Sequence, residues 1–121
     1  MRRSQLRGYL LAALALLGCT SPRANRARDL TSRVVEVRST GESAPAAVVA
    51  VAFRNQSADA LEIRSYRLRW PGGTFTAEMR DLLVPPHAEV ERKARVDSGA
   101  GDISTLRRED VTIEVVVALA R

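Results

Sequence analysis

The period-two alternation of apolar residues most restricts how this chain folds. Over residues 46–54, the larger apolar residues fall on one face and the smaller ones on the other. The larger set is Ala47, Val49, Val51 and Phe53. Successive side chains of a β-strand point to opposite faces of the sheet, so this pattern is typical of a strand with one face in the core. The sequence therefore predicts a protein built from strands.

Turn signals separate seven segments with strand patterns. These segments are residues 33–38, 46–54, 61–70, 74–79, 82–84, 89–96 and 111–119. Pro71-Gly72-Gly73 predicts a tight turn between two paired strands. Six or seven short strands with this spacing predict an all-β fold, an antiparallel immunoglobulin-like β-sandwich over residues 33–121.

Two details of strand phase can be tested against the structure. Leu61 and Ile63 are out of phase with Tyr66, Leu68 and Trp70, which predicts a bulge or kink near Arg64-Ser65. In the last strand we expect one face to carry every second residue from the start of the segment. Those residues are Val111, Ile113, Val115, Val117 and Leu119.

The N-terminal residues have a different composition. Residues 1–7 carry three arginines and no acid, and residues 8–18 form an apolar run of 11. A membrane-spanning helix needs about 20 residues, so the run is too short to span but has the length of a signal-peptide core. The run ends in Leu16-Leu17-Gly18-Cys19. The alternative is a plain secretory signal or a short helix with a buried cysteine.

The sequence from Leu16 to Cys19 resembles the lipobox of bacterial lipoproteins: Leu, a variable residue, Gly or Ala, and then Cys. The resemblance implies cleavage between Gly18 and Cys19, removal of residues 1–18, and lipid on Cys19, the only cysteine. A thiol is readily alkylated, and two or more acyl chains hold a protein stably on a membrane. In such lipoproteins an Asp after the cysteine commonly favours the inner membrane, whereas this chain has Thr20 there. The expected location is therefore the outer membrane, facing the periplasm.

Residues 19–32 are polar and basic and lack an apolar period, so we expect a flexible tether over this range. The predicted signal contains three of the 19 basic residues and none of the 14 acidic ones. Most of the excess positive charge is then lost with the signal, and arginines alternate with glutamates in the rest of the chain. Nucleic-acid binding would need a concentrated basic surface. We therefore expect no nucleic-acid partner.

Catalysis has little support in the sequence. His87 is the only histidine and follows Pro85-Pro86 in a predicted turn. With no second histidine or free cysteine, the usual zinc ligand sets cannot form, and no Gly-x-Ser-x-Gly motif marks a serine nucleophile. Residues 97–102 begin and end in Asp but lack the alternating ligands and final Glu of a calcium loop. We expect no catalytic residues, no metal and no cofactor.

Two surface features are candidates for partner binding. The first is an apolar surface on the outward faces of two strands, formed by Val48, Ala50, Ala52, Val116 and Ala118. The alternative interpretation is that a loop or the tether covers this sheet face. The second is a cluster of arginines beside two aromatic residues: Arg54, Arg64, Arg67 and Arg69 beside Tyr66 and Trp70. Such a stripe is more often a charged guard against edge pairing than a binding site.

Three segments carry a family resemblance: residues 49–57, 61–68 and 84–90. They resemble small bacterial envelope lipoproteins with an immunoglobulin-like sandwich, and are similar to late-embryogenesis-abundant type 2 (water-hypersensitivity) domains. In those domains a hydrophobic strand ends in Asn, here Asn55, and a later strand carries Tyr-x-Leu, here Tyr66 to Leu68. The usual Asn-Pro is absent, because Gln56 follows Asn55. The resemblance implies a fold and no catalytic residues.

These observations predict a non-enzymatic lipoprotein whose β-sandwich acts as an interaction or assembly module for an envelope protein. The alternative is a carrier of a small apolar ligand or lipid, held between the sheets.

Overall fold

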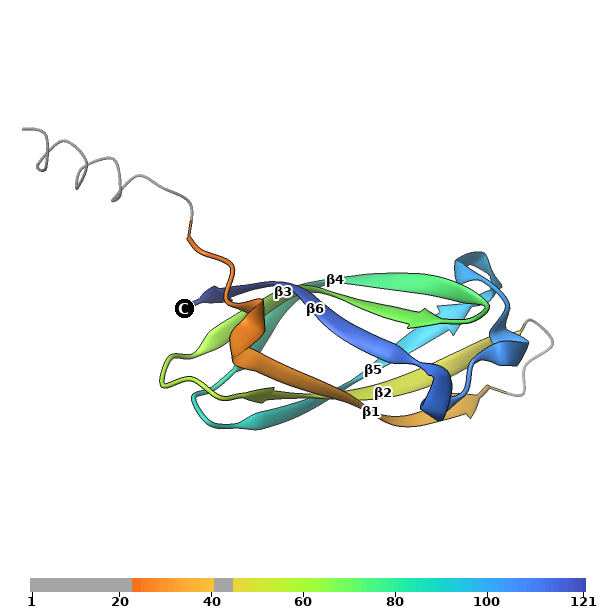
Figure 1. The fold of residues 1–121 in the computed structure, drawn as a ribbon, viewed down its shortest axis with the longest axis horizontal. Coiled ribbons are helices and arrows are strands. Elements are labelled where there is room, and N and C mark those ends of the chain that lie inside the picture. The colour runs from red at the N-terminus through yellow and green to blue at the C-terminus, as the bar shows by residue number, and fades with distance from the viewer. Residues whose placement is uncertain (1–22, 41–44) are drawn as a thin grey trace, which may run out of the picture.

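The computed structural model describes residues 23–40 and 45–121. In this part of the chain six strands form two three-stranded antiparallel sheets, stacked as two layers (Figure 1). The strands are β1 (Leu30–Ser39), β2 (Ala46–Asn55), β3 (Leu61–Trp70), β4 (Gly73–Val84), β5 (Glu89–Asp97) and β6 (Thr112–Ala120). One sheet has the order β1-β2-β5 and the other β4-β3-β6. The predicted all-β sandwich is confirmed, with six strands because segments 74–79 and 82–84 belong to one strand, β4.

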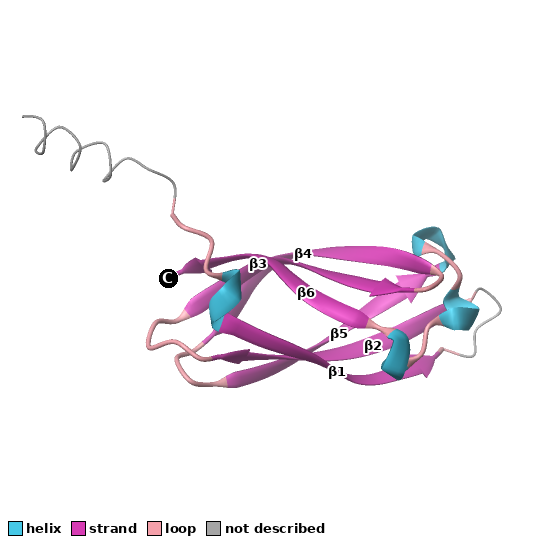
Figure 2. Ribbon diagram, in the orientation of Figure 1, coloured by secondary structure: helices cyan, strands magenta, loops and turns pink. Residues whose placement is uncertain are grey.

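Four short 3-10 turns complete the described structure: η1 (Ala27–Asp29), η2 (Ser98–Ala100), η3 (Ile103–Thr105) and η4 (Arg108–Asp110). Figure 2 shows η2, η3 and η4 gathered at one end of the sandwich and η1 at the other. We call the end with η1, loop 56–60 and turn 85–88 the proximal end. The distal end carries the β3–β4 turn and η2 to η4.

The core lies between the two layers and is formed by the residues that alternation selected. The larger face of β2 is buried, with Val49, Val51 and Phe53 fully inaccessible to solvent. The Phe53 ring meets the Tyr66 ring of the opposite sheet, with centroids 5.2 Å apart and planes tilted by 60°. Burial raises the pKa of the Tyr66 hydroxyl. Truncating a buried aromatic residue such as Phe53 to Ala typically costs about 3–5 kcal/mol.

The sheet that contains β3 has an irregularity running across all three strands. Pairing with β4 and with β6 shifts between Ile63 and Ser65, which confirms the bulge predicted near Arg64-Ser65. On β6 a second shift leaves Val116 without a register partner. The inward face therefore carries Val115 before the shift and Ala118 after it. The predicted single face through Val117 and Leu119 is wrong in the second half of the strand.

The domain begins earlier in the chain than the sequence predicted. β1 begins at Leu30, three residues before the predicted boundary at 33, and Leu30 is buried in the core. Residues 30–32 pair with the end of β2 and so belong to the sheet. The predicted tether over 19–32 is therefore too long at its C-terminal side. Residues 19–22 lie outside the described residues.

Candidate functional site

The N-terminal segment 23–29 lies along the free edge of β6. Asn25 takes the place of a neighbouring strand: its Oδ1 accepts from the Ala118 amide at 3.0 Å and its Nδ2 donates to the Val116 carbonyl at 2.7 Å. The Arg26 amide donates to the Ala118 carbonyl at 2.7 Å, and Arg23 Nη1 donates to the Ala120 carbonyl at 3.0 Å. Alternate residues of a strand direct their carbonyls to the same edge. The segment therefore occupies the side of β6 that faces away from β3.

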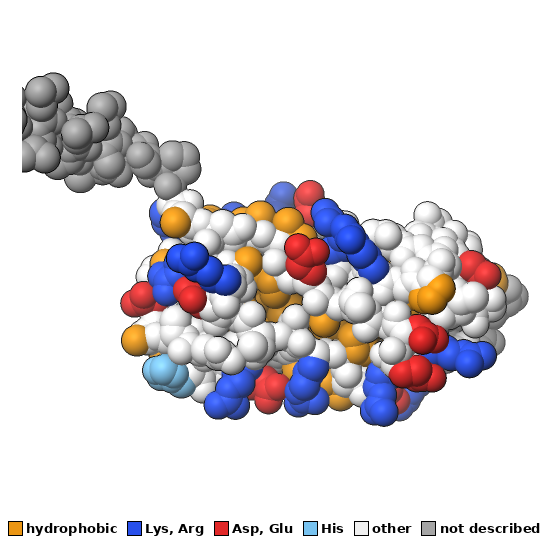
Figure 3. Space-filling view, in the orientation of Figure 1, with side chains coloured by type: hydrophobic (Ala, Val, Ile, Leu, Met, Phe, Trp, Pro, Cys, Tyr) orange, Lys and Arg blue, Asp and Glu red, His pale blue; other side chains and the backbone are white. Residues whose placement is uncertain are grey.

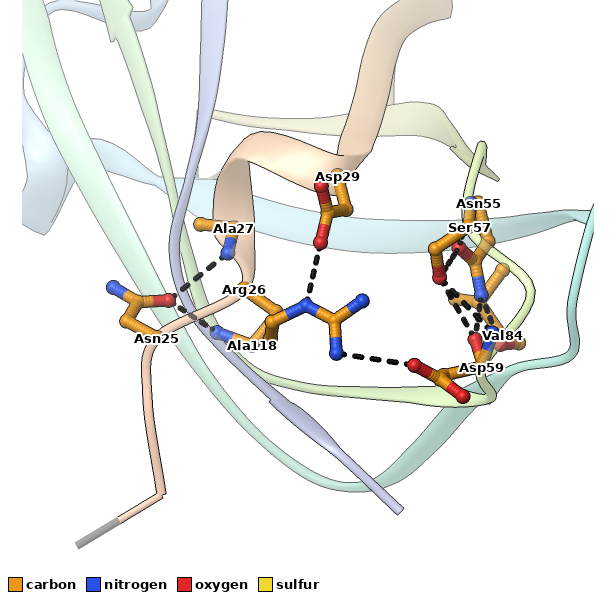
Figure 4. A network of polar contacts seen from close by, with 9 residues as sticks. All are labelled: Asn25, Arg26, Ala27, Asp29, Asn55, Ser57, Asp59, Val84 and Ala118. Carbon is orange, nitrogen blue, oxygen red and sulfur yellow. Dashed lines mark hydrogen bonds and ion pairs between the residues drawn. The ribbon is translucent and has the colours of Figure 1, made fainter. Parts of the chain in front are cut away.

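Arg26 and Asp29 fasten this segment to the proximal end (Figure 4). The Arg26 guanidinium donates to Asp29 and, at 3.3 Å, to Asp59 of the β2–β3 loop. The hydrogen bonds that Arg26 donates to Asp29 and Asp59 raise the pKa of its guanidinium. The Gln56 amide donates to the Asp29 carbonyl at 3.0 Å. The segment is thus joined to both β6 and the loop.

The same loop is held from inside by Asn55, which is fully buried. Its Nδ2 donates to the carbonyls of Asp59 at 2.7 Å and Val84 at 3.0 Å. Its Oδ1 accepts from the amide and the hydroxyl of Ser57. The turn that sequence predicts at Asn55 is therefore a side-chain-centred turn that also joins β4. We call residues 23–29 with this loop the proximal clamp.

Sequence reasoning missed the clamp because residues 19–32 carry no apolar period. The spacing of Arg26 and Asp29 was the available signal, since residues three apart meet within a helical turn. Leu30 is also in phase with the inward positions of β1. The role of Asn25 has no local signal, because its partners lie 91 and 93 residues away in the chain.

Gly18 and Cys19, the predicted cleavage and lipidation site, lie outside the described residues. Within residues 23–40 and 45–121 no helix has the length and apolar character needed to cross a membrane.

The predicted partner surface is only partly brought together. Val48, Ala50 and Ala52 form one row on the outward face of β2, between β1 and β5. Val48 is half-buried, whereas Ala50 and Ala52 are each only 3% exposed. Ala50 and Ala52 do not belong to the core cluster between the sheets. They are buried on the outward face of β2, where they form the floor of a trough.

Charged side chains of the flanking strands β1 and β5, together with Arg54 of β2, form the walls of the trough. Glu36, Arg38 and Lys93 border a hollow of about 280 Å³ over Val48 and Ala50. A second hollow of about 330 Å³ lies over Ala52, beside Arg33, Arg54 and Glu89. Arg38 pairs with Glu36 at 2.8 Å and Arg33 with Glu89 at 3.1 Å. Figure 3 shows basic and acidic side chains interspersed along this layer.

Val116 and Ala118 do not join this trough. They belong to β6 in the other sheet, and Ala118 is fully buried in the core. The physical reason is the shift at Val116, which turns Ala118 inward. The prediction that Val116 and Ala118 belong to the partner surface is therefore wrong.

The predicted arginine cluster is also divided. Arg64, Arg67 and Arg69 lie on β3, whereas Arg54 lies on β2 of the opposite sheet. Tyr66 and Trp70 point into the core, away from these arginines. Arg64 instead pairs with the buried Glu62 at 2.8 Å, and Arg121 approaches the other oxygen of Glu62 at 3.3 Å. An open hollow of about 500 Å³ beside the bulge is lined by Arg64, Ser65, Glu78, Met79, Arg80 and Val117.

The residues considered for catalysis or calcium binding, His87, Asp97 and Asp102, lie in a turn or cap a 3-10 turn. His87 is an exposed turn residue with a φ of +57°. Asp97 caps η2 by accepting from the Gly99 amide, and Asp102 caps η3 by accepting from the amide and hydroxyl of Ser104. These bonds lower the pKa of Asp102. No group of three or more His, Cys, Asp or Glu side chains suited to a metal ion occurs among the described residues.

No protein-family description, curated protein or solved structure matches this chain. A proposal about function therefore rests on the amino-acid sequence and on the fold and surfaces described above.

Proposed function

We propose that this chain is a lipid-anchored protein of the bacterial cell envelope that presents its β-sandwich as a non-enzymatic interaction or assembly module. The observation that carries the proposal is the sequence of residues 1–19: a basic start without acids, an apolar run of 11 residues, and a lipobox-like ending at Cys19. Thr20 favours the outer membrane, with the domain facing the periplasm.

The anchor is tested on the protein isolated from a bacterial host that processes lipoproteins. The intact mass should correspond to a chain that starts at Cys19 and carries acyl groups, and the protein should partition into detergent. Cys19→Ser should leave an unmodified chain with residues 1–18 still attached. A wild-type chain that starts at Met1 and is recovered without detergent would overturn the proposal.

The trough over β2 is the surface we propose for the partner protein. Its floor of Val48, Ala50 and Ala52 accepts small apolar groups, and its walls offer paired charges of both signs. Exposed ion pairs each contribute little to stability, so a partner can exchange them at low cost. Apolar contact at the centre with a polar rim is the usual anatomy of a protein interface.

Substitution of Val48 tests this surface in the anchored protein. Val48→Arg fills the trough with a long charged side chain and should abolish crosslinks to the envelope partner captured by the wild type. Thr112→Arg is the matched control, because Thr112 is exposed on a strand of the other sheet. Equal crosslinking by both variants would exclude the trough as the binding surface.

The carrier alternative has one favourable observation. A hollow of about 320 Å³ at the distal end is lined by residues of β1, β2 and η3 and by the adjacent Pro45 and Leu106. Its apolar residues are Val37, Pro45, Ala46, Ala47, Ile103 and Leu106. Native mass spectrometry of the purified protein separates the two functions: a copurifying lipid mass lost in Ser39→Trp, a change at an exposed residue of the hollow, favours the carrier, and an empty domain that retains its partner favours the module.

A further inference from the structure

We infer that the proximal clamp fixes the orientation of the sandwich on the membrane, so that the proximal end faces the lipid headgroups and the distal end points away. This inference rests on the proposed lipid anchor at Cys19. Its independent basis is the way in which residues 23–29 are bound to the domain.

The clamp prevents the N-terminal segment from acting as a free tether. Arg23, Asn25 and Arg26 together contact β6 at its Val116, Ala118 and Ala120 carbonyls and at the Ala118 amide. Arg26 and Asp29 then bind the β2–β3 loop. Contacts to two separate elements fix both the position and the direction of the segment.

The chain between the anchor and the clamp is short. Four residue steps separate Cys19 from Arg23, and a fully extended chain spans at most about 3.3–3.6 Å per residue. The point of docking therefore lies within about 14 Å of the lipidated residue. A flexible tether over the whole predicted range 19–32 would have allowed about 45–50 Å.

The elements at the proximal end are suited to a polar membrane surface. Loop 56–60 exposes Gln56, Ala58 and Asp59, and turn 85–88 exposes two prolines and His87. Arg23 and Arg28 are exposed beside them. Basic side chains near a bilayer are attracted to anionic headgroups. The two acids of the clamp, Asp29 and Asp59, both pair with Arg26, which limits their repulsion from such a surface.

This orientation determines which surfaces a partner in the periplasm can reach. The strands contain 9 to 12 residues, so the distal end lies about 30 Å farther from the membrane. The trough over β2 runs along the side of the domain between the two ends. Partners should therefore approach from the side or from the distal end.

Fluorescence quenching measures the orientation directly. Because Cys19 is the only native cysteine and is lipidated, an introduced cysteine is the single site for a dye. Ala58→Cys places the dye on the proximal loop and Ser98→Cys places it on η2 at the distal end; both positions are exposed. The lipidated variants are reconstituted in phosphatidylethanolamine–phosphatidylglycerol vesicles that contain lipids with nitroxide headgroups.

The expected result is several-fold stronger quenching at Ala58→Cys than at Ser98→Cys. Inserting about twelve Gly and Ser residues between Pro22 and Arg23 adds a span of about 20 Å and should remove the difference. The pair Asn25→Ala and Arg26→Ala should reduce it, with the fold checked by circular dichroism.

Three outcomes would overturn the inference. Equal quenching at both sites in sedimented vesicles means that the anchored domain has no fixed orientation. A difference that persists after the insertion means that the proximal end itself, and not the docked segment, selects the lipid surface. A chain that does not sediment with vesicles overturns the proposed anchor, and with it this inference.

Discussion

The proximal end of the sandwich is closed by polar side chains, whereas the distal end is closed by close approach of backbone at glycines. Proximally, the carboxamides of Asn25 and Asn55 occupy hydrogen-bonding positions that a backbone would otherwise fill. Distally, Gly73 and Gly101 form an isolated bridge, and the Trp70 indole donates to the Asp102 carbonyl at 2.9 Å. Side-chain closure can loosen one contact at a time, but backbone contact leaves no room for an added atom. The two ends should therefore respond differently to substitution.

The largest effect is expected from Gly101→Ala at the distal end. Gly101 has a φ of +145°, and a Cβ there would lie 2.4 Å from the Gly72 carbonyl oxygen. Strain and steric overlap together should lower the free energy of unfolding by about 3–4 kcal/mol. Urea denaturation measures the change. Gly99→Ala is the matched control. Its Cβ would lie 3.0 Å from a side-chain carboxylate oxygen of Asp97, and it would meet no backbone atom of another segment. Equal losses in both variants would contradict the role of backbone contact.

Asn55→Ala should be the most damaging change at the proximal end. It removes the donor to the Val84 and Asp59 carbonyls and the acceptor for Ser57. Leaving buried carbonyls without partners should cost about 2–3 kcal/mol. Asn55→Asp keeps the acceptor and loses the donor, so it separates the two halves of the network. If Asn55→Ala unfolds at the wild-type urea concentration, the side chain does not hold this end.

Asn25→Ala should act locally and cost about 1 kcal/mol or less, because Asn25 is exposed. The Ala118 amide should then exchange its hydrogen faster, while amides at the distal end keep their protection. Hydrogen exchange followed by NMR measures both. Uniform loss of protection through the domain would show that the clamp is part of the global fold.

The smallest effect is a pH dependence at Asp102. Hydrogen bonds from Ser104 lower its pKa, so the ionised carboxylate stabilises the cap of η3. This contribution is complete above the ordinary carboxyl pKa and is lost as pH falls through the lowered pKa of the folded protein. The Ser104 amide resonance should move in that acidic range, and Asp102→Asn should remove the transition. A transition that survives in Asp102→Asn belongs to another group.

How far the sequence predicted this structure depended on how clearly each strand marks its two faces. In β2 large and small residues alternate, and in β3 arginines mark the outward positions, so the core and the bulge at Arg64-Ser65 were predictable. In β6 the run from Val115 to Ala120 is entirely apolar. No polar residue marks the outward face there, so the shift at Val116 and the burial of Ala118 could not be predicted.

The candidate sites were less predictable than the fold for a related reason. The trough over β2 followed from alternation, because its floor is the small face of that strand. The clamp depends on contacts between residues about 90 positions apart, such as Asn25 and Val116, which have no periodic pattern. The predicted arginine cluster is divided because β2 and β3, although consecutive in the chain, belong to different sheets. The sequence alone does not show which sheet each strand joins.

The placement of Asn25 on β6 has a practical consequence for recombinant production. A fragment cut at Arg33, where alternation first becomes clear, would discard Leu30 and expose the outer carbonyls of β6. An unprotected sheet edge is a template for pairing with other molecules. Such a fragment should aggregate, whereas one that begins at Arg23 keeps the edge covered.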